Sequence, residues 1–95
     1  MTERTPLTPE DIQTHLSNLP DWSKGNDAIT KTFKFKSYMD EIAFVNRVAN
    51  AAETADHHPD IILVYRQVVV SLTTHDAKGI TQKDFALAAE IDGLV

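Results

Sequence analysis

The chain has 95 residues, with nine lysines and arginines against fourteen aspartates and glutamates, and it contains no cysteine. This length predicts a single domain over residues 1–95, with room for one thin core. The acidic balance argues against nucleic-acid binding, which needs clustered positive charge. The lack of cysteine excludes disulfides and thiol nucleophiles. No stretch approaches the ~20 apolar residues of a membrane span, and the first six residues lack the apolar run of a signal peptide, so we expect a cytoplasmic protein.

The first predicted element is a helix over residues 8–19. Thr8 can cap it, and Pro9 fits the first helical position. Apolar residues then recur at helical spacing as far as Leu19. Pro20 ends the helix, because the residue before a proline is pushed out of the helical region.

Two strands are predicted next, a short one over residues 21–24 and a longer one over residues 28–36. The longer one alternates apolar and polar side chains, which predicts a strand with one wet face. Trp22, the only tryptophan, lies in the short strand. Its commoner role is core packing, and the alternative is a wall beside a flat ligand.

The longest predicted helix covers residues 38–56. Ser37 can cap it, apolar residues recur at helical spacing, and its alanine-rich second half allows close approach to a sheet. His57, His58 and Pro59 follow at once. Because Pro59 disfavours helical geometry at His58, both imidazoles lie where the chain leaves the helix.

Two further strands are predicted over residues 60–65 and 68–74, with a tight connection at Arg66 and Gln67. The first of them is apolar on both faces, from Ile61 to Val64, and a strand of that kind is covered on both faces. The helices of so short a chain can cover only one face well. We therefore expect a homo-oligomer; partial cover by the chain's own termini is the alternative.

A last helix is predicted between Thr81 and Gly93, with Asp84 as the capping partner of Thr81. The order helix, strand, strand, helix, strand, strand, helix predicts an α+β domain. An antiparallel sheet in such a domain carries its helices on one face.

Three of the four histidines can meet at one rim of this domain, because His57 and His58 end a helix and His75 ends a strand. Such a cluster can exchange protons near neutral pH. Metal binding is disfavoured, because metal-binding helix pairs sit four residues apart and these two are adjacent. The absence of a Gly-x-Ser-x-Gly elbow and of cysteine disfavours nucleophilic catalysis.

Metal-free acid–base chemistry on a small polar molecule, such as dehydration or isomerisation, is the functional interpretation that is left. The structural alternative is that His57 and His58 only cap a helix C-terminus, where cationic side chains are favoured. The residue types alone leave both interpretations open.

Most of the chain resembles the pterin-4a-carbinolamine dehydratase family. The resemblance is strongest over residues 51–91, and it rests on the combination of Glu53-x-x-x-His57-His58-Pro59 with Thr74-His75, followed by Gly79-Ile80-Thr81 and Asp84. The first half matches through Trp22 and Phe33-x-Phe35. The chain departs from many members at Ile61, where they have a tryptophan.

The resemblance implies dehydration of 4a-hydroxytetrahydropterin to quinonoid dihydropterin, with no metal and no cofactor. That reaction recycles the pterin cofactor of aromatic amino-acid hydroxylases. The family fold is a four-stranded antiparallel sheet with three helices, and it assembles as a homodimer or homotetramer. Some relatives instead dimerise with other proteins, including a transcription factor. A non-catalytic dimerisation or binding module on the same fold is therefore the alternative.

The resemblance also implies a set of site residues. His57, His58 and His75 are expected to be catalytic, with one imidazolium protonating the departing hydroxyl and one imidazole taking the N5 proton. We expect His58 and His75 to flank the hydroxyl. Glu53 is expected to orient His57, and Asp84 to orient His75. The residues expected to bind or orient the substrate are Glu53, Thr73, Thr74, Asp76, Asp84 and Trp22.

Overall fold

The computed structural model describes residues 6–95. Residues 1–5, for which the sequence predicts no signal peptide, lie outside the described part of the chain. The elements in chain order are α1 (Pro9–Leu16), β1 (Ser23–Gly25), β2 (Ala28–Lys34), α2 (Tyr38–Ala55), β3 (Asp60–Val64), β4 (Gln67–Leu72), a 3-10 turn (His75–Ala77) and α3 (Gln82–Asp92). This is the predicted order of helices and strands.

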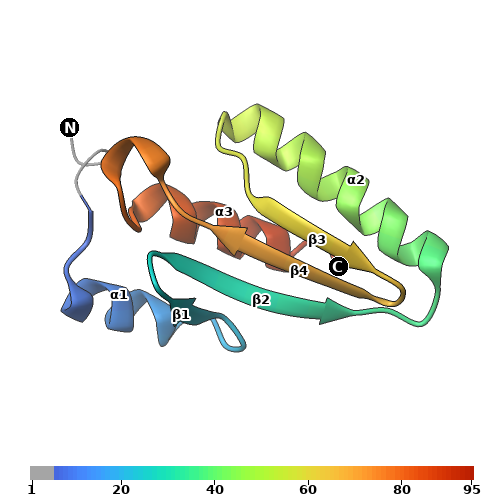
Figure 1. Ribbon diagram of the computed structural model, residues 1–95, viewed down its shortest axis with the longest axis horizontal. Helices are drawn as coiled ribbons and strands as arrows, with labels where there is room; N and C mark the ends of the chain where they lie inside the picture. The colour runs from blue at the N-terminus through green and yellow to red at the C-terminus, as the bar shows by residue number, and fades with distance from the viewer. Residues whose placement is uncertain (1–5) are drawn as a thin grey trace.

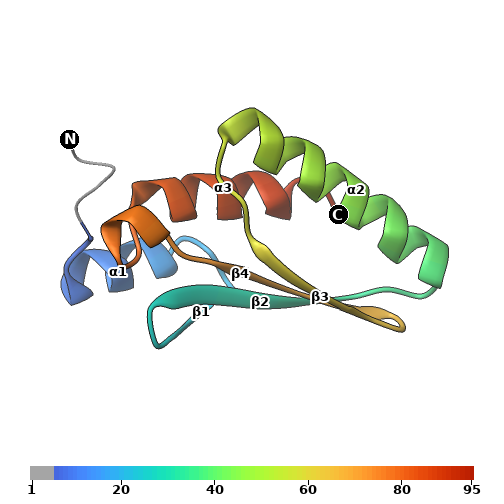
Figure 2. The ribbon, with the colours of Figure 1, turned by 45° about the horizontal axis from the view of Figure 1, so that its top comes forward.

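The four strands form one antiparallel sheet in the order β1-β2-β4-β3. All three helices lie on one face of this sheet, as Figures 1 and 2 show. The α+β fold class, with helices on one face, is confirmed. Within residues 6–95, no helix is both long enough and apolar enough to cross a membrane.

The core lies between the sheet and the helices, and period-two alternation explains which strand residues reach it. Val68, Val70 and Leu72 of β4 are fully buried, and their partners across the ladder include Ile29 and Phe33 of β2. The helices cover these side chains with an apolar set made of Phe44, Val48, Leu87, Ala88 and Ile91.

The first helix is shorter than predicted, because it ends at Leu16 and not before Pro20. Thr8 caps it as expected, with its hydroxyl accepting from the Asp11 amide at 3.2 Å. The segment after Leu16 turns back instead, and the Trp22 amide donates to the Leu19 carbonyl. This turn brings Trp22 into the core, and burial of the indole outweighs the further turn of helix that the apolar spacing predicted.

A buried carboxylate holds the β3–β4 hairpin. Val64 pairs with Gln67, so the turn is made by Tyr65 and Arg66, one residue earlier than predicted. The amides of Arg66 and Gln67 donate to the two carboxylate oxygens of Glu41 at 2.9 and 3.1 Å. Glu41 is 0% exposed. Hydrogen bonds to a charged group contribute about 1.5–3 kcal/mol each, so this carboxylate stabilises the tight turn.

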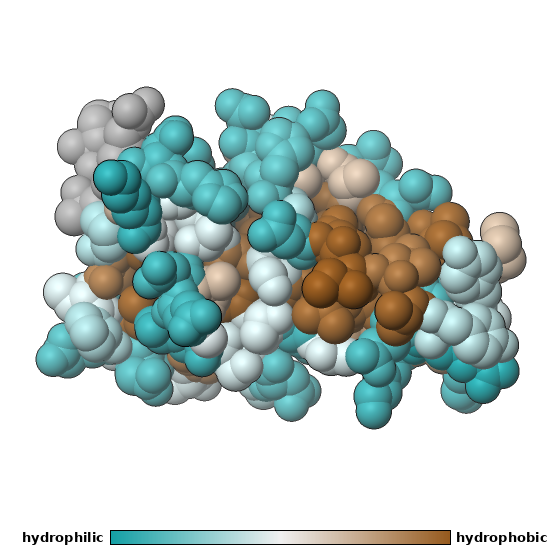
Figure 3. All heavy atoms as spheres, in the orientation of Figure 1, coloured by the Kyte–Doolittle hydropathy of each residue, from teal (hydrophilic) through white to brown (hydrophobic). Residues whose placement is uncertain are grey.

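The helix-free face of the sheet carries an apolar patch on its edge strand. Ile61 and Leu63 of β3 point toward the helices, whereas Ile62 and Val64 point outward and are 60% and 48% exposed. Figure 3 shows hydrophobic atoms gathered over β3 and the adjoining side of α2. Exposed large apolar or aromatic side chains at this end of the molecule are Tyr38, Met39, Ile62, Val64 and Tyr65; we call this set the β3 patch.

Candidate active site

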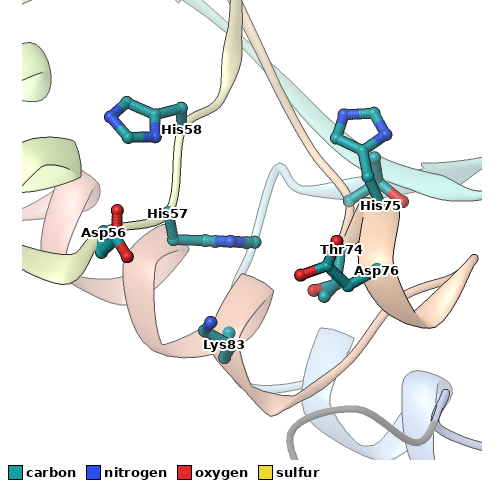
Figure 4. Close-up of a pocket in the computed structure, with 8 residues that line it drawn as sticks. Asp56, His57, His58, Thr74, His75, Asp76 and Lys83 are labelled. Carbon is teal, nitrogen blue, oxygen red and sulfur yellow. The ribbon is translucent and has the colours of Figure 1, made fainter.

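A hollow of about 190 Å³ opens where the end of α2 meets the segment that follows β4. Its lining consists of Asp56, His57, His58, Thr73, Thr74, His75, Asp76 and Lys83. Figure 4 shows the ring of His57 lying across the hollow, with His58 and His75 standing on opposite sides of it. The three histidines singled out from the sequence are therefore brought together.

The backbone at Asp56 separates the two adjacent histidines. Asp56 adopts a left-handed conformation with φ 51°, which ends α2 at Ala55. His57 and His58 consequently lie beyond the helix, where successive side chains point to different sides of the chain. His57 is buried at 8% exposure, whereas the side chain of His58 is 57% exposed.

His57 belongs to a buried polar network centred on Asp84. Its Nε2 lies 2.6 Å from Oδ1 of Asp84, which is 0% exposed. The other oxygen of Asp84 accepts from the Thr74 hydroxyl at 3.0 Å and from the Thr81 amide at 2.9 Å. Because a carboxylate can only accept, this contact requires a hydrogen on Nε2 of His57, so the lone pair of a neutral ring lies on Nδ1.

His58 has a carboxylate partner of its own, in solvent. Its Nε2 lies 2.6 Å from Oε2 of Glu53, and the Glu53 side chain is 77% exposed. Exposed pairs of this kind contribute only about 0.2–1 kcal/mol. The two histidine–carboxylate pairs thus have similar lengths and very different surroundings.

Both predicted carboxylate partners were wrong. Glu53 was expected to orient His57 but contacts His58, because the left-handed turn at Asp56 sends His57 into the interior and breaks the helical spacing. Asp84 was expected to orient His75 but contacts His57. The capping box with Thr81, predicted as the alternative role of Asp84, is also present and fixes its carboxylate inside the domain.

The segment after β4 supplies the other wall. His75 starts the 3-10 turn and is exposed. It lines the hollow from the side opposite His58 (Figure 4). The hydroxyls of Thr73 and Thr74 already have structural partners: Thr73 donates to the Asp27 carbonyl at 2.6 Å, and Thr74 donates to Asp84. These two hydroxyls therefore have no further hydrogen to donate to a ligand, whereas the backbone groups of this segment are also at hand.

Trp22 does not line the hollow, so the expectation that it contacts the substrate was wrong, and the core packing predicted as its commoner role is confirmed. The indole is buried in the core against Phe33, and its Nε1 donates to both carboxylate oxygens of Asp92 at 3.0 and 3.1 Å. Ile61, the position of the family's tryptophan, packs against the core. The hollow has no phenylalanine, tyrosine or tryptophan among its lining residues between positions 6 and 95.

Two lining residues, Asp56 and Lys83, were not predicted. Each directly precedes a site residue in sequence, Asp56 before His57 and Lys83 before Asp84. A lysine in the first turn of a helix opposes the helix dipole, and this was the available signal for Lys83. In the described part of the chain, no three His, Cys, Asp or Glu side chains converge as metal ligands would.

The fold and the hollow define a class of small α+β proteins with three clustered histidines, two of which contact a carboxylate. The sequence profile of the family described as pterin 4 alpha carbinolamine dehydratase matches residues 5–94. The chain belongs to this family. It is 53% identical over 90 residues to a candidate pterin-4-alpha-carbinolamine dehydratase of a Picosynechococcus species, covering 95% of this chain and 98% of that protein. A similar relative from Thermosynechococcus vestitus is 50% identical over 94 residues, covering 99% and 97%.

Two solved structures share the fold. A transcriptional coactivator/pterin dehydratase from Brucella melitensis superposes with a TM-score of 0.91 at 35% identity, covering 95% of this chain and 98% of that one. A pterin dehydratase-like protein identified as a RuBisCO assembly factor in the alpha-carboxysome superposes with a TM-score of 0.68 at 26% identity, covering 80% and 90%. This fold is therefore found in proteins described as dehydratases and in a protein described as an assembly factor.

Proposed function

We propose that this chain dehydrates 4a-hydroxytetrahydropterin to quinonoid dihydropterin by histidine acid–base catalysis, as a step in recycling the pterin used by aromatic amino-acid hydroxylases. One observation carries the proposal: three imidazoles surround a single hollow, and two of them are held by carboxylates. Family membership supplies the substrate class. If His57 and His58 only capped a helix, neither the buried partner Asp84 nor the third imidazole, that of His75, would be needed.

In the proposed mechanism, His57 is the base. Its Nδ1 takes the proton from N5, and the electron pair of that N–H bond forms the C4a–N5 double bond as the C4a–O bond breaks. Asp84 holds the ring through Nε2 and balances the positive charge that the ring acquires. Placing the base in a buried network fixes its orientation, which is what proton transfer requires.

His58 is the proposed acid, and His75 flanks the hydroxyl from the opposite side. The imidazolium form of His58 gives its proton to the departing hydroxyl, which leaves as water. Its exposed position allows solvent to return that proton after each turnover. Glu53 holds the ring from outside, while Asp76 and the backbone of residues 73–76 are proposed to contact the edge of the pterin.

The proposal is tested by stopped-flow dehydration of freshly generated 4a-hydroxytetrahydropterin with the purified full chain. We expect an acceleration over the spontaneous reaction that is proportional to protein concentration and survives exhaustive chelation. A rate equal to the spontaneous one, from protein shown by circular dichroism to be folded, would overturn the enzymatic assignment and leave the binding module as the function.

We further propose that the chain forms a homodimer or homotetramer through the β3 patch. Two observations support a second copy as the occupant. The outer edge of β3 has no neighbouring strand in the sheet formed by the described residues, so its free backbone groups can pair with an identical edge. Ile62 and Val64 beside that edge are exposed apolar side chains, which association would remove from water.

Sedimentation equilibrium tests this assembly. We expect a mass at least twice 10.6 kDa for the parent protein. Ile62→Lys should lower it toward the single-chain mass, because a charge would then have to be buried at the interface. Gln13→Lys, which adds the same charge at an exposed position of α1, is the matched control. A parent protein that sediments as one chain would contradict the two-sided strand argument.

A further inference from the structure

Lys83 is the one lysine or arginine among the residues that line the hollow, and Figure 4 shows it in the first turn of α3, on the side of the His57 ring opposite His58 and His75. It is half-buried, and it adjoins Asp84 in sequence. Its backbone amide takes part in the Thr81 cap at 3.2 Å. The helix start is thus held independently of the lysine ammonium.

The ammonium of Lys83 has no structural role visible in the fold. Between residues 6 and 95, it forms no ion pair and no hydrogen bond, unlike Lys31, whose ammonium lies 2.8 Å from Asp92. A cation in the first helical turn opposes the helix dipole. The Lys83 ammonium is therefore a half-buried donor that lowers the stability of the helix and meets no acceptor among the described residues. A ligand that supplies the acceptor would explain its position.

The other lining side chains are unsuited to bind an acceptor group. Asp56 and Asp76 can only accept. The Thr73 and Thr74 hydroxyls already donate within the protein. The histidines are the groups that exchange protons. Lys83 is therefore the side chain left to donate to a ligand oxygen.

We propose that Lys83 donates a hydrogen bond to the 4-oxo oxygen of the pterin and makes the site selective for 4-oxo over 4-amino heterocycles. The assignment depends on the proposed function, because it takes a pterin as the ligand. Carbon 4 is bonded to C4a, the carbon that loses the hydroxyl. Any pose that brings C4a and N5 to the histidines therefore also brings the 4-oxo oxygen close to His57, and Lys83 lines the same hollow beside that ring.

The test compares the affinities of two neutral ligands, pterin and 2,4-diaminopteridine, by titration of ligand fluorescence with the full chain. At position 4 an acceptor is replaced by an amino group, which is a donor like the Lys83 ammonium. The two ligands also differ at N3, which carries a hydrogen only in pterin, so the contribution of Lys83 is read from the change in preference between the parent and Lys83→Met. For the parent protein we expect pterin to bind at least about tenfold more tightly, the usual effect of losing a charged hydrogen bond. Lys83→Met should reduce the preference to within about threefold, and Lys83→Arg should restore it.

Lys36→Met is the matched control, because it removes the same charge from an exposed lysine beyond the far end of β2. It should leave the preference unchanged, which separates a local contact from a change in net charge. Equal preference in the parent and in Lys83→Met, or tighter binding of the diamino compound by the parent, would overturn the role of Lys83 while leaving the dehydratase assignment intact. Failure of the parent to bind either ligand would overturn both.

Discussion

Replacing Asp84 by asparagine is expected to lower the turnover number of the dehydration by about 10²–10⁴ with little change in KM. Asp84 is fully buried, and its two oxygens serve different partners, His57 on one side and the Thr81 amide on the other. The Thr81 amide can only donate, so it should take the single amide oxygen of the asparagine. The amide nitrogen then faces His57, where an acceptor is needed.

That reversal changes the tautomer of His57. A donor opposite Nε2 forces this nitrogen to accept, so the hydrogen moves to Nδ1, the nitrogen proposed to take the substrate proton. Nitrogen-15 NMR of the imidazole should show hydrogen on Nε2 in the parent and on Nδ1 in Asp84→Asn. A variant with unchanged tautomer and unchanged turnover would remove the His57–Asp84 pair from the mechanism.

Asp92→Asn is the matched control for this experiment. Asp92 is another aspartate of α3 that accepts several hydrogen bonds, but its partners Trp22 and Lys31 are not among the residues that line the hollow. Both substitutions should cost stability, by about 1–3 kcal/mol, because each replaces a charged acceptor of several hydrogen bonds by a neutral amide with one acceptor oxygen. Only Asp84→Asn should change the turnover number, which separates catalysis from general loss of stability.

Replacing His58 by alanine should also lower the dehydration rate by about 10²–10⁴, the usual contribution of a placed general acid. The ring is more than half exposed, so its removal should leave the unfolding midpoint in urea nearly unchanged. Stopped-flow measurement of the rate checks the first expectation. An unchanged rate would remove His58 from the proposed chemistry.

Glu53 should matter much less than its partner. Because the pair with His58 is exposed and worth no more than about 1 kcal/mol, Glu53→Ala should lower the rate by about fivefold at most. The control for His58→Ala, described above, is His15→Ala. It also removes an imidazole, but His15 stacks on Phe85 and is not among the residues that line the hollow. A larger loss in Glu53→Ala than in Asp84→Asn would contradict the ranking of the two pairs by burial.

The local pattern of the chain was sufficient for the order of elements and for the expectation that His57, His58 and His75 meet at one rim. Caps at Thr8, Ser37 and Thr81 each accept the predicted backbone hydrogen bond. These features depend on neighbouring residues, and the physical rules for them are short-range. Element ends were predicted less well, as at the helix that stops at Leu16, because burial of distant side chains decides where a helix ends.

The partners within the site could not be predicted in the same way. Spacing along a helix suggested that Glu53 would meet His57, but one left-handed residue, Asp56, redirected the chain. The pairing of His57 with Asp84 joins residues 27 positions apart, and the contact of Glu41 with the β3–β4 turn joins residues 25 positions apart. Neither pair has a sequence signal, because both follow from how α2 and α3 pack on the sheet.

By itself the amino-acid sequence determined the fold class, the family and the three histidines, since hydrophobic periodicity and residue type are local properties. Only the tertiary structure decided which carboxylate holds which ring, which ring is buried, that Trp22 belongs to the core, and that Lys83 reaches the hollow. The physical reason is that burial and hydrogen-bond partnership depend on the packing of elements distant in the chain. Packing also decides whether losing one partner of a polar pair costs a few tenths of a kcal/mol or several.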